Sequence, residues 1–133
     1  AAKALALGAD AVAIGTAALV ALGDNAPRWA DDYAALGTAP GYWDDYQDGT
    51  DPAGICTQDD TLAARLDPVE GGRRVANYLR VLTMEAQTIA RACGHNHLHN
   101  LEPEDLCALT MEAAAMARVP RAGTDWWPGK AGF

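Results

Sequence analysis

Short apolar blocks open the chain and predict a helix followed by a buried strand. Residues Ala1–Leu7 are mostly strong helix formers, and the helix is expected to end at Gly8. The apolar run Ala11–Ile14 is too short for a helix and is typical of a strand that is buried on both faces. We therefore expect one helix and one strand of a parallel sheet at this end of the chain.

A glycine-threonine turn follows the predicted strand. Gly15 and Thr16 lead into a second helical stretch over Ala17–Leu22. In a parallel α/β barrel the last strand ends in this way, and the N–H groups of the following helix N-terminus attract a phosphate. A complete barrel needs about 250 residues, whereas this chain has 133. We therefore expect most of the barrel to lie in another chain or in upstream sequence.

Helical periodicity dominates the chain from Pro68 onward. Pro103 is expected to start a second helix that runs through Leu109, and Thr110 is expected to cap a third. The tail that carries two tryptophans is expected to lie across the body of the protein or a partner. One apolar stripe with spacings of four and three predicts a long helix that ends at Gly94, and its members are Val75, Leu79, Leu82, Ala86, Ile89 and Cys93.

The segment 24–67 between these parts is rich in Gly, Pro, Asp and aromatic residues. Eleven acidic residues lie between Asp24 and Glu70, and the net charge of the chain is −8. We interpret this acidic run as a solvated face, with a docking surface for a basic partner as the alternative. Aromatic residues supply buried area that disordered segments lack, so we expect an ordered excursion with a short helix over Arg28–Leu36. An acidic surface disfavours nucleic acids and anionic membranes, and no apolar run reaches membrane length.

Candidate chemistry is sparse along the chain. Its cysteines, Cys56, Cys93 and Cys107, are an odd number that fits a reducing cytoplasm, and the last two are expected in the core. Three histidines alternate in the segment 95–99, but no second ligand cluster accompanies them, so we predict no metal site. The chain has no serine for a nucleophilic triad. It also lacks signal-peptide architecture, so we expect an internal or processed N-terminus.

Four stretches of the chain, taken in order, resemble the C-terminal part of the FMN-binding domain of glutamate synthase. They read KALALGADAVAIGTAALVALG, DPAGICTQD, RRVANYLRVLTMEAQTIARACGH and LEPEDLCALTMEAAAMARVP. The resemblance implies an α/β fold in which residues 1–23 are the last helix-strand portion of a (β/α)₈ TIM barrel. Residues 24–67 would then form a long ordered loop in place of the iron–sulfur loop, and residues 68–133 a C-terminal helical segment with a tail.

The resemblance also implies a cofactor, FMN, at the C-terminal mouth of the barrel strands. The basic residues that hold the substrate are expected on earlier strands, so no catalytic residue is assigned in this chain. The residues that match the phosphate-binding turn of the family, and that we expect to bind FMN, are Ile14, Gly15, Thr16 and Ala17.

One departure from the family concerns an iron–sulfur cluster. Glutamate synthases typically carry three cysteines, in the pattern C-x₅-C-x₄-C, and these hold a [3Fe–4S] cluster. In this sequence the corresponding positions are Pro40, Tyr46 and Asp51, none of which can replace a thiolate. We therefore predict no iron–sulfur cluster in this chain, and we expect packed side chains of the segment 24–67 in its place.

The resemblance implies an oxidoreductase that aminates 2-oxoglutarate to glutamate. The lost cysteines favour the N-methylglutamate-synthase-like branch, which works with separate amidotransferase-like and glutamate-synthase-like partner chains. Two alternatives stay open. An amine such as methylamine could replace ammonia and give an N-substituted glutamate, or the barrel could be a non-catalytic scaffold. In each case we expect a cytoplasmic subunit of a complex that is not active alone.

Overall fold

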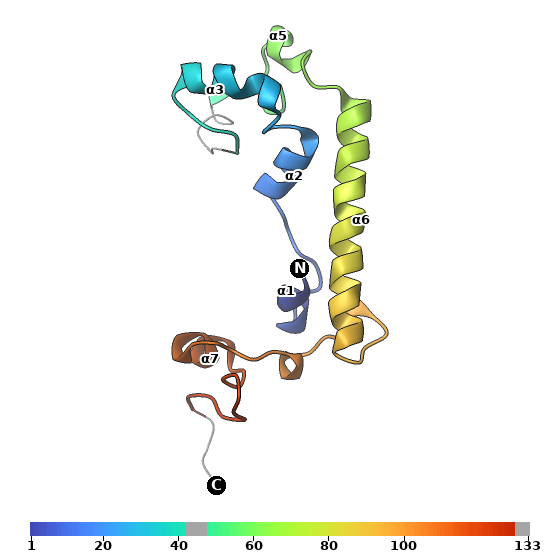
Figure 1. Cartoon of the computed structure of the whole chain (residues 1–133), viewed down its shortest axis with the longest axis vertical. Coiled ribbons are helices and arrows are strands. Elements are labelled where there is room, and N and C mark those ends of the chain that lie inside the picture. Colours follow the sequence, from blue (N-terminus) through green and yellow to red (C-terminus); the bar gives the residue numbers. More distant parts are fainter. Residues whose placement is uncertain (42–47, 130–133) are drawn as a thin grey trace. The chain divides into compact units, whose positions relative to one another are not determined.

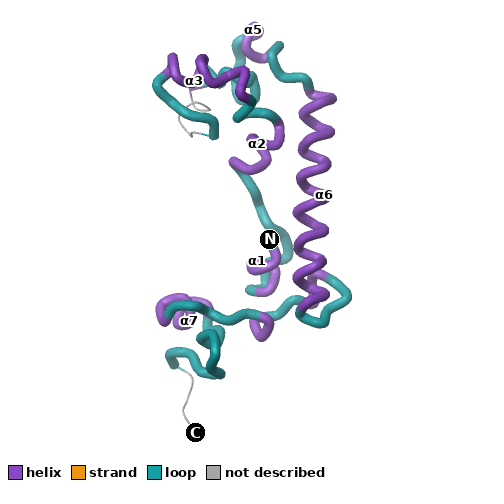
Figure 2. Tube along the Cα trace, viewed as in Figure 1, coloured by secondary structure: helices purple, strands orange, loops and turns teal. Residues whose placement is uncertain are grey.

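The computed structural model describes residues 1–41 and 48–129, and over these residues it contains helices, turns and irregular segments but no regular β-strand (Figures 1 and 2). The chain divides into two compact units. One unit consists of Ala1–Val12 and Leu82–Phe133, and the other of Ala13–Val81. No helix in the described part of the chain is long and apolar enough to cross a membrane.

The first unit is built around alanines. Helix α1 (Ala2–Ala6) ends before Gly8, whose φ of 97° is left-handed, so the predicted helix end is confirmed. The predicted long helix is also confirmed as α6 (Pro68–Ala92), which ends before Gly94. A small core joins α1 to the end of α6, and its members are Ala2, Ala6, Ala86, Ala90 and Leu101.

The C-terminal part of this unit is less helical than its sequence predicts. Pro103 begins only a 3₁₀ turn, η3 (Pro103–Asp105), so the predicted helix through Leu109 is wrong. The reason is that Leu106 is extended and that Ala108 forms a parallel bridge with Arg121, which draws the chain away from a helical path. Two further helices lie here, η2 (Leu98–Asn100) and α7 (Met111–Ala117), and the predicted cap of α7 is confirmed because Thr110 Oγ1 accepts the Ala113 N–H at 3.2 Å.

The second unit contains the predicted ordered excursion. It consists of α2 (Thr16–Leu22), η1 (Pro27–Trp29), α3 (Ala30–Leu36), α5 (Asp60–Ala63) and the start of α6. The short helix expected over Arg28–Leu36 is confirmed by η1 and α3. Three of the aromatic residues on which this expectation depends, Tyr42, Trp43 and Tyr46, lie outside the described residues.

The run Ala11–Ile14, expected as a strand, has no regular secondary structure in this chain. Val12 and Ile14 are 37% and 39% exposed. A strand needs a neighbour for its N–H and C=O groups, and the described residues supply none. The barrel therefore stays a prediction about a larger structure.

The apolar stripe of α6 is only partly covered. Ala86 is buried and Val75 and Leu82 are half-buried. Leu79 and Ile89 are exposed. The expectation that Cys93 and Cys107 lie in the core is wrong, since all three cysteines are exposed. Cys93 is exposed because helix α1 is only five residues long and packs against Ala86 and Ala90 of α6. Cys107 precedes the buried Ala108 in an extended segment, where neighbouring side chains point to opposite sides.

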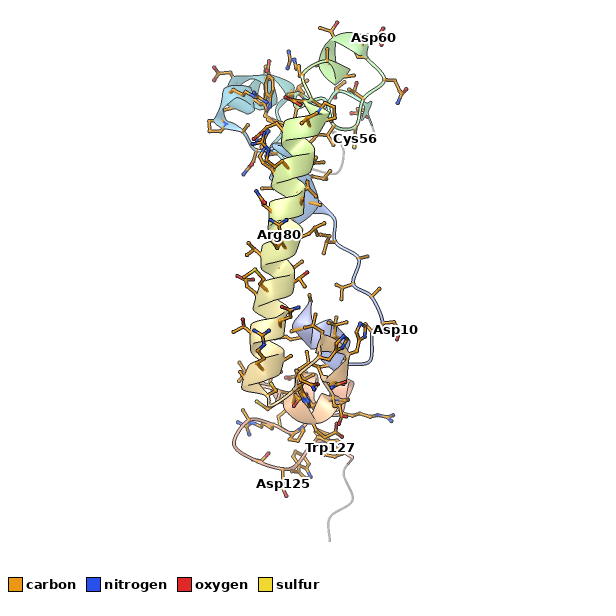
Figure 3. The ribbon with its side chains drawn as sticks, turned by 90° about the vertical axis from the view of Figure 1, so that its right-hand side faces the viewer. Asp10, Cys56, Asp60, Arg80, Asp125 and Trp127 are labelled. Carbon is orange, nitrogen blue, oxygen red and sulfur yellow. The ribbon has the colours of Figure 1, made fainter. Side chains whose placement is uncertain are left out.

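We expect the substitution Asp59→Ala to destabilise α5 by about 1 kcal/mol. Asp59 is the N-cap, and its Oδ1 accepts the N–H groups of Thr61 and Leu62 at 2.8 and 2.9 Å. The control is Asp60→Ala, which removes the same charge from the neighbouring exposed position (Figure 3). Hydrogen exchange at the Ala63 amide, which bonds to the Asp59 carbonyl, measures the effect. Equal acceleration in the two variants would show that the cap bonds contribute nothing.

Candidate functional site

The predicted phosphate turn lies at the start of α2. Gly15 is the residue before the helix, and the space where a Cβ would stand at this position is open. Ile14, Gly15, Thr16 and Ala17 are all exposed. The first N–H groups of an α-helix have no acceptor within the helix, so this turn offers donors to a ligand. The Thr16 methyl lies against Gly41, where an added Cβ would approach it to 2.7 Å.

A buried polar cluster lies in the same unit, and the sequence analysis did not single it out. Asp24 and Asp51 are 0% exposed and Tyr33 is 2% exposed. Tyr33 Oη lies 2.7 Å from Asp24 Oδ1 and 2.8 Å from Asp51 Oδ1. The interpretation of the acidic run as a solvated face is therefore wrong for these two aspartates. We refer to Asp24, Tyr33 and Asp51 as the buried triad.

Asp51 organises the loop that follows it. Its Oδ1 accepts the Ala53 N–H at 3.1 Å, and its Oδ2 accepts the Ile55 N–H at 2.8 Å. Gly54 makes this tight loop feasible because its φ is +76° and an added Cβ would overlap the Leu62 carbonyl oxygen. An aspartate directly before Pro-Ala-Gly is a local signal for such a side-chain-to-backbone turn, whereas its burial depends on the distant Tyr33.

The arrangement of the buried triad changes the acid–base properties of Tyr33 itself and of the neighbouring Cys56. Burial and the hydrogen bonds with Asp24 and Asp51 raise the pKa of the Tyr33 phenol far above its ordinary value, so the phenol stays neutral. Burial, and then the nearby carboxylate of Asp51, also raise the pKa of the Cys56 thiol. Cys56 is therefore a poor candidate for an activated nucleophile, although its side chain is exposed.

Of the three cysteine positions of the family, only one carries a described carboxyl. Pro40 has no ligating atom in its side chain, and Tyr46 lies outside the described residues. Asp51 is held by three donors of its own unit, namely Tyr33 and the two loop amides. Its oxygens are thus already engaged within the protein.

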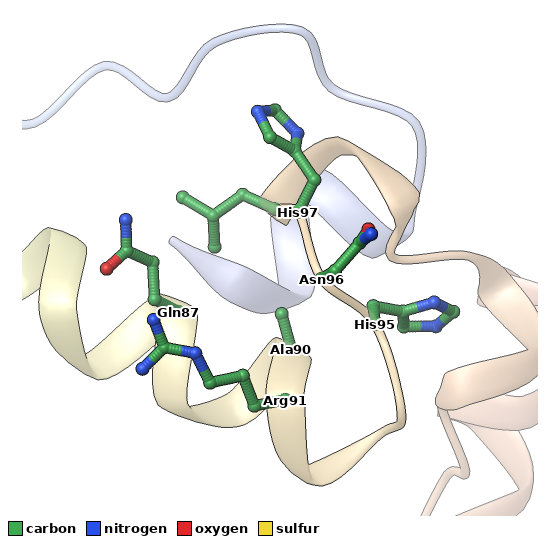
Figure 4. A pocket seen from close by; sticks show the side chains of 7 residues that line it. Gln87, Ala90, Arg91, His95, Asn96 and His97 are labelled. Atoms are coloured by element: carbon green, nitrogen blue, oxygen red, sulfur yellow. The ribbon is translucent and has the colours of Figure 1, made fainter.

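Two of the three alternating histidines line a small pocket in the first unit. His95 and His97 line it together with Gln87 and Arg91, but these side chains do not converge on one point (Figure 4). His97 and His99 stack with ring centroids 5.5 Å apart. Among residues 1–41 and 48–129, no group of three or more His, Cys, Asp or Glu side chains gathers that could hold a metal ion. The absence of a metal from the whole chain stays a prediction.

The partner of His95 is a carboxylate. Its Nε2 lies 2.7 Å from Asp105 Oδ2, and the same carboxylate oxygen accepts the Glu102 N–H at 2.9 Å. The Glu102 N–H, followed by His95, holds the pKa of Asp105 below its ordinary value. The Asp105 carboxylate thus links His95, which precedes η2, to Glu102 at the start of η3, and we expect these bonds to stabilise the turn between η2 and η3.

We expect the η2–η3 turn to loosen under acidic conditions. A carboxyl whose pKa is lower in the folded state contributes stability above its unfolded pKa, and this contribution is lost as the pH falls through the folded pKa. The measurement is hydrogen exchange of the Glu102 amide as a function of pH, corrected for intrinsic rates. In the variant Asp105→Asn the acid-dependent part should disappear, and an unchanged acid-dependent part would contradict this assignment.

Comparison with known proteins gives consistent results. Residues 47–96 match the family model described as a conserved region in glutamate synthase. The chain is 74% identical over 132 residues to the glutamate synthase large subunit-like protein of Rhizobium meliloti strain 1021, which covers 99% of this chain and 30% of the relative. It is 42% identical over 99 residues to the archaeal glutamate synthase (NADPH) of Methanocaldococcus jannaschii, covering 74% of this chain and 16% of the relative.

The archaeal-type glutamate synthase (NADPH) of Thermotoga neapolitana is 43% identical over 99 residues, with the same 74% of this chain and 16% of the relative covered. No solved structure shows a significant match. The chain thus spans less than a third of the length of these curated relatives. These matches identify the chain as a glutamate synthase-like sequence.

Proposed function

We propose that this chain is part of a glutamate synthase-like oxidoreductase that aminates 2-oxoglutarate to glutamate. The observation that carries the proposal is the 74% identity to a glutamate synthase large subunit-like protein over 99% of the chain. The match of residues 47–96 to the conserved region of glutamate synthase supports it independently. Since the chain spans 30% of that relative, we assign the activity to a longer protein or an assembly.

We propose that residues 1–23 form the end of an FMN-binding barrel. FMN would supply hydride chemistry when bound. The residues of this chain would hold its phosphate through backbone N–H groups at the start of α2. The fit is supported by the open space at Gly15 and by the exposure of the cofactor-binding residues expected from the sequence, Ile14, Gly15, Thr16 and Ala17.

The exposed apolar residues beside this turn support a larger structure around it. Val12 and Ile14 are exposed, and Val20 on α2 is 37% exposed. We propose that the remainder of the barrel covers them, because burying the part of each side chain that is still exposed would contribute roughly 0.5–1 kcal/mol. A strand with neighbours on both sides would then form over Ala11–Ile14.

We propose further that this segment contains no iron–sulfur cluster. The support is chemical, because Asp51 stands at one of the three cysteine positions and its carboxylate oxygens accept bonds from Tyr33, Ala53 and Ile55. Electrons would then reach the flavin directly from a soluble donor, or the reaction would be redox-neutral. This feature favours the branch that works with separate amidotransferase-like and glutamate-synthase-like chains.

The experiment that tests the proposal is an absorption spectrum of the purified longer protein, with mass spectrometry of the small molecules that it releases on denaturation. We expect flavin absorption and released FMN, and the substitution Ala17→Asp should reduce the FMN content because it places a negative charge beside the phosphate. The control Ala64→Asp introduces the same charge at another exposed position. A colourless protein would instead favour the non-catalytic scaffold.

The same preparation separates the two amination reactions. With an added two-electron donor, either reduced ferredoxin or a reduced nicotinamide, turnover of 2-oxoglutarate with ammonia should give glutamate and water, whereas turnover with methylamine in place of ammonia would give N-methylglutamate. The mass of the product distinguishes them. Formation of neither product by a flavin-loaded protein would overturn the proposed activity while leaving FMN binding in place.

A further inference from the structure

The buried triad presents a problem of hydrogen counting. Tyr33 Oη lies within hydrogen-bond distance of one oxygen of Asp24 and one oxygen of Asp51, at 2.7 and 2.8 Å. A phenol has a single hydrogen and can donate it to only one of two carboxylates. If both carboxyls were ionised, the phenol hydrogen would lie in only one of the two short contacts. The other contact would then join two oxygen atoms with no hydrogen between them. At least one further proton is therefore needed among these three groups.

The surroundings of Asp51 favour its ionised form. Besides the contact with Tyr33, its two oxygens accept the N–H groups of Ala53 and Ile55. A carboxylate is a pure acceptor, and hydrogen bonds from backbone N–H groups stabilise its charge. All three neighbours of Asp51 can act as donors, so this carboxyl has no need of a proton of its own.

The surroundings of Asp24 favour its neutral form. Among the described residues, its Oδ1 has a hydrogen bond only with Tyr33, and its Oδ2 is buried without a hydrogen-bond partner. An ionised oxygen in such a place would lose its hydration without compensation, whereas a neutral carboxyl loses far less. The proton needed by the triad is thus most favourably placed on Asp24.

No cation of the described part neutralises the triad instead. The Arg74 guanidinium lies beside Gly23, but its ion pair is with Glu70, at 3.7 Å. Arg65 bonds with Asp32 and the Pro52 carbonyl. Within the described residues, neither arginine comes within 4 Å of a carboxylate oxygen of Asp24 or Asp51.

We propose that Asp24 carries a proton and donates it to the Tyr33 hydroxyl, which donates its own hydrogen to an ionised Asp51. The triad then holds one negative charge in place of two. Both hydrogens shared by the three side chains then have an acceptor, and the negative charge lies on Asp51, whose oxygens accept the amides of Ala53 and Ile55. This inference concerns only the second unit and does not depend on the proposed enzyme activity.

The exposed Cys56 provides a reporter of this charge. An ionised carboxyl nearby disfavours the thiolate, whereas a neutral carboxyl does not. We would measure the rate of iodoacetamide alkylation at Cys56 against pH by peptide mass spectrometry, in the full-length wild-type protein and in its Asp24→Asn and Asp51→Asn variants. Because the reaction is followed on one peptide, other cysteines do not interfere.

Asp24→Asn should leave the alkylation profile of Cys56 unchanged, because a neutral group replaces a neutral group and the amide can still donate to Tyr33. Asp51→Asn should shift the profile to lower pH and accelerate alkylation severalfold below the thiol midpoint. An equal shift in both variants would overturn the proposal, because it would show that both carboxyls are ionised.

Infrared difference spectroscopy gives a second readout if Asp51→Asn fails to fold. A protonated carboxyl has a C=O stretch that is separate from the bands of carboxylates. We expect such a band in the difference between wild type and Asp24→Asn at neutral pH, with the isotope shift of labelled aspartate. Its absence would overturn the proposal, whatever the outcome for activity or flavin content.

Discussion

The substitution Gly54→Ala is expected to destabilise the second unit by about 4 kcal/mol, a large loss for a single substitution. The methyl group would overlap the carbonyl oxygen of Leu62, which is backbone and cannot rotate away. Residue 54 also has a φ of +76°, which costs an alanine about 1 kcal/mol by itself. Hydrogen exchange of the α3 amides in the longer protein measures the loss as an increase of roughly a thousandfold.

The control for this experiment is Gly37→Ala. Gly37 has a similar φ of +72°, but the space where its Cβ would stand is open. The two variants therefore share the backbone strain and differ in the collision with Leu62. We expect about 1 kcal/mol for Gly37→Ala. Losses of the same size at both positions would mean that the loop adapts to the methyl group and that the close approach is not essential.

The substitution Asp51→Ala is expected to destabilise the same unit by about 3 kcal/mol. It removes the acceptor of three donors at once, namely the Tyr33 hydroxyl and the Ala53 and Ile55 amides. Each donor stays buried away from water but no longer has a hydrogen-bond partner, so its desolvation destabilises the folded state without compensation. The measurement is the rate of native-state proteolysis within segment 48–60 of the longer protein, which follows the population of the open form.

The matched control is Asp31→Ala, which removes a carboxylate from an exposed position in the first turn of α3. Such a change costs at most about 1 kcal/mol through the helix dipole. We expect proteolysis to accelerate about a hundredfold in Asp51→Ala and far less in the control. If the cleavage rates of the two variants agree, the buried triad does not hold the loop.

Local elements of this chain could be predicted from the sequence because their signals are local. Gly8, Gly37 and Gly94 mark helix ends with left-handed backbone, and the cap at Thr110 is a short-range hydrogen bond. The helix expected after Pro103 failed for a reason that is not local. The pairing of Ala108 with Arg121 joins residues that no periodicity connects.

The buried triad could not be predicted for the same reason. Asp24 and Asp51 lie within a run of acidic residues whose average behaviour is exposure, and only the fold brings Tyr33 between them. The family resemblance, in contrast, came from four ordered stretches, and the match over residues 47–96 confirms a glutamate synthase-like sequence. The FMN turn and the barrel stay predictions, because none of the contacts among the described residues tests them.

The alanine core of the first unit has an evolutionary consequence. Four of its five members are alanines, and each contributes only a methyl group, worth about 0.8 kcal/mol on burial. Such a core derives little energy from any one side chain, yet a larger residue at Ala6 or Ala90, which are each 2% exposed, would have no room. Aligned relatives should therefore show only alanine, glycine or serine at these two positions, while neighbouring exposed positions of α6 drift freely in size.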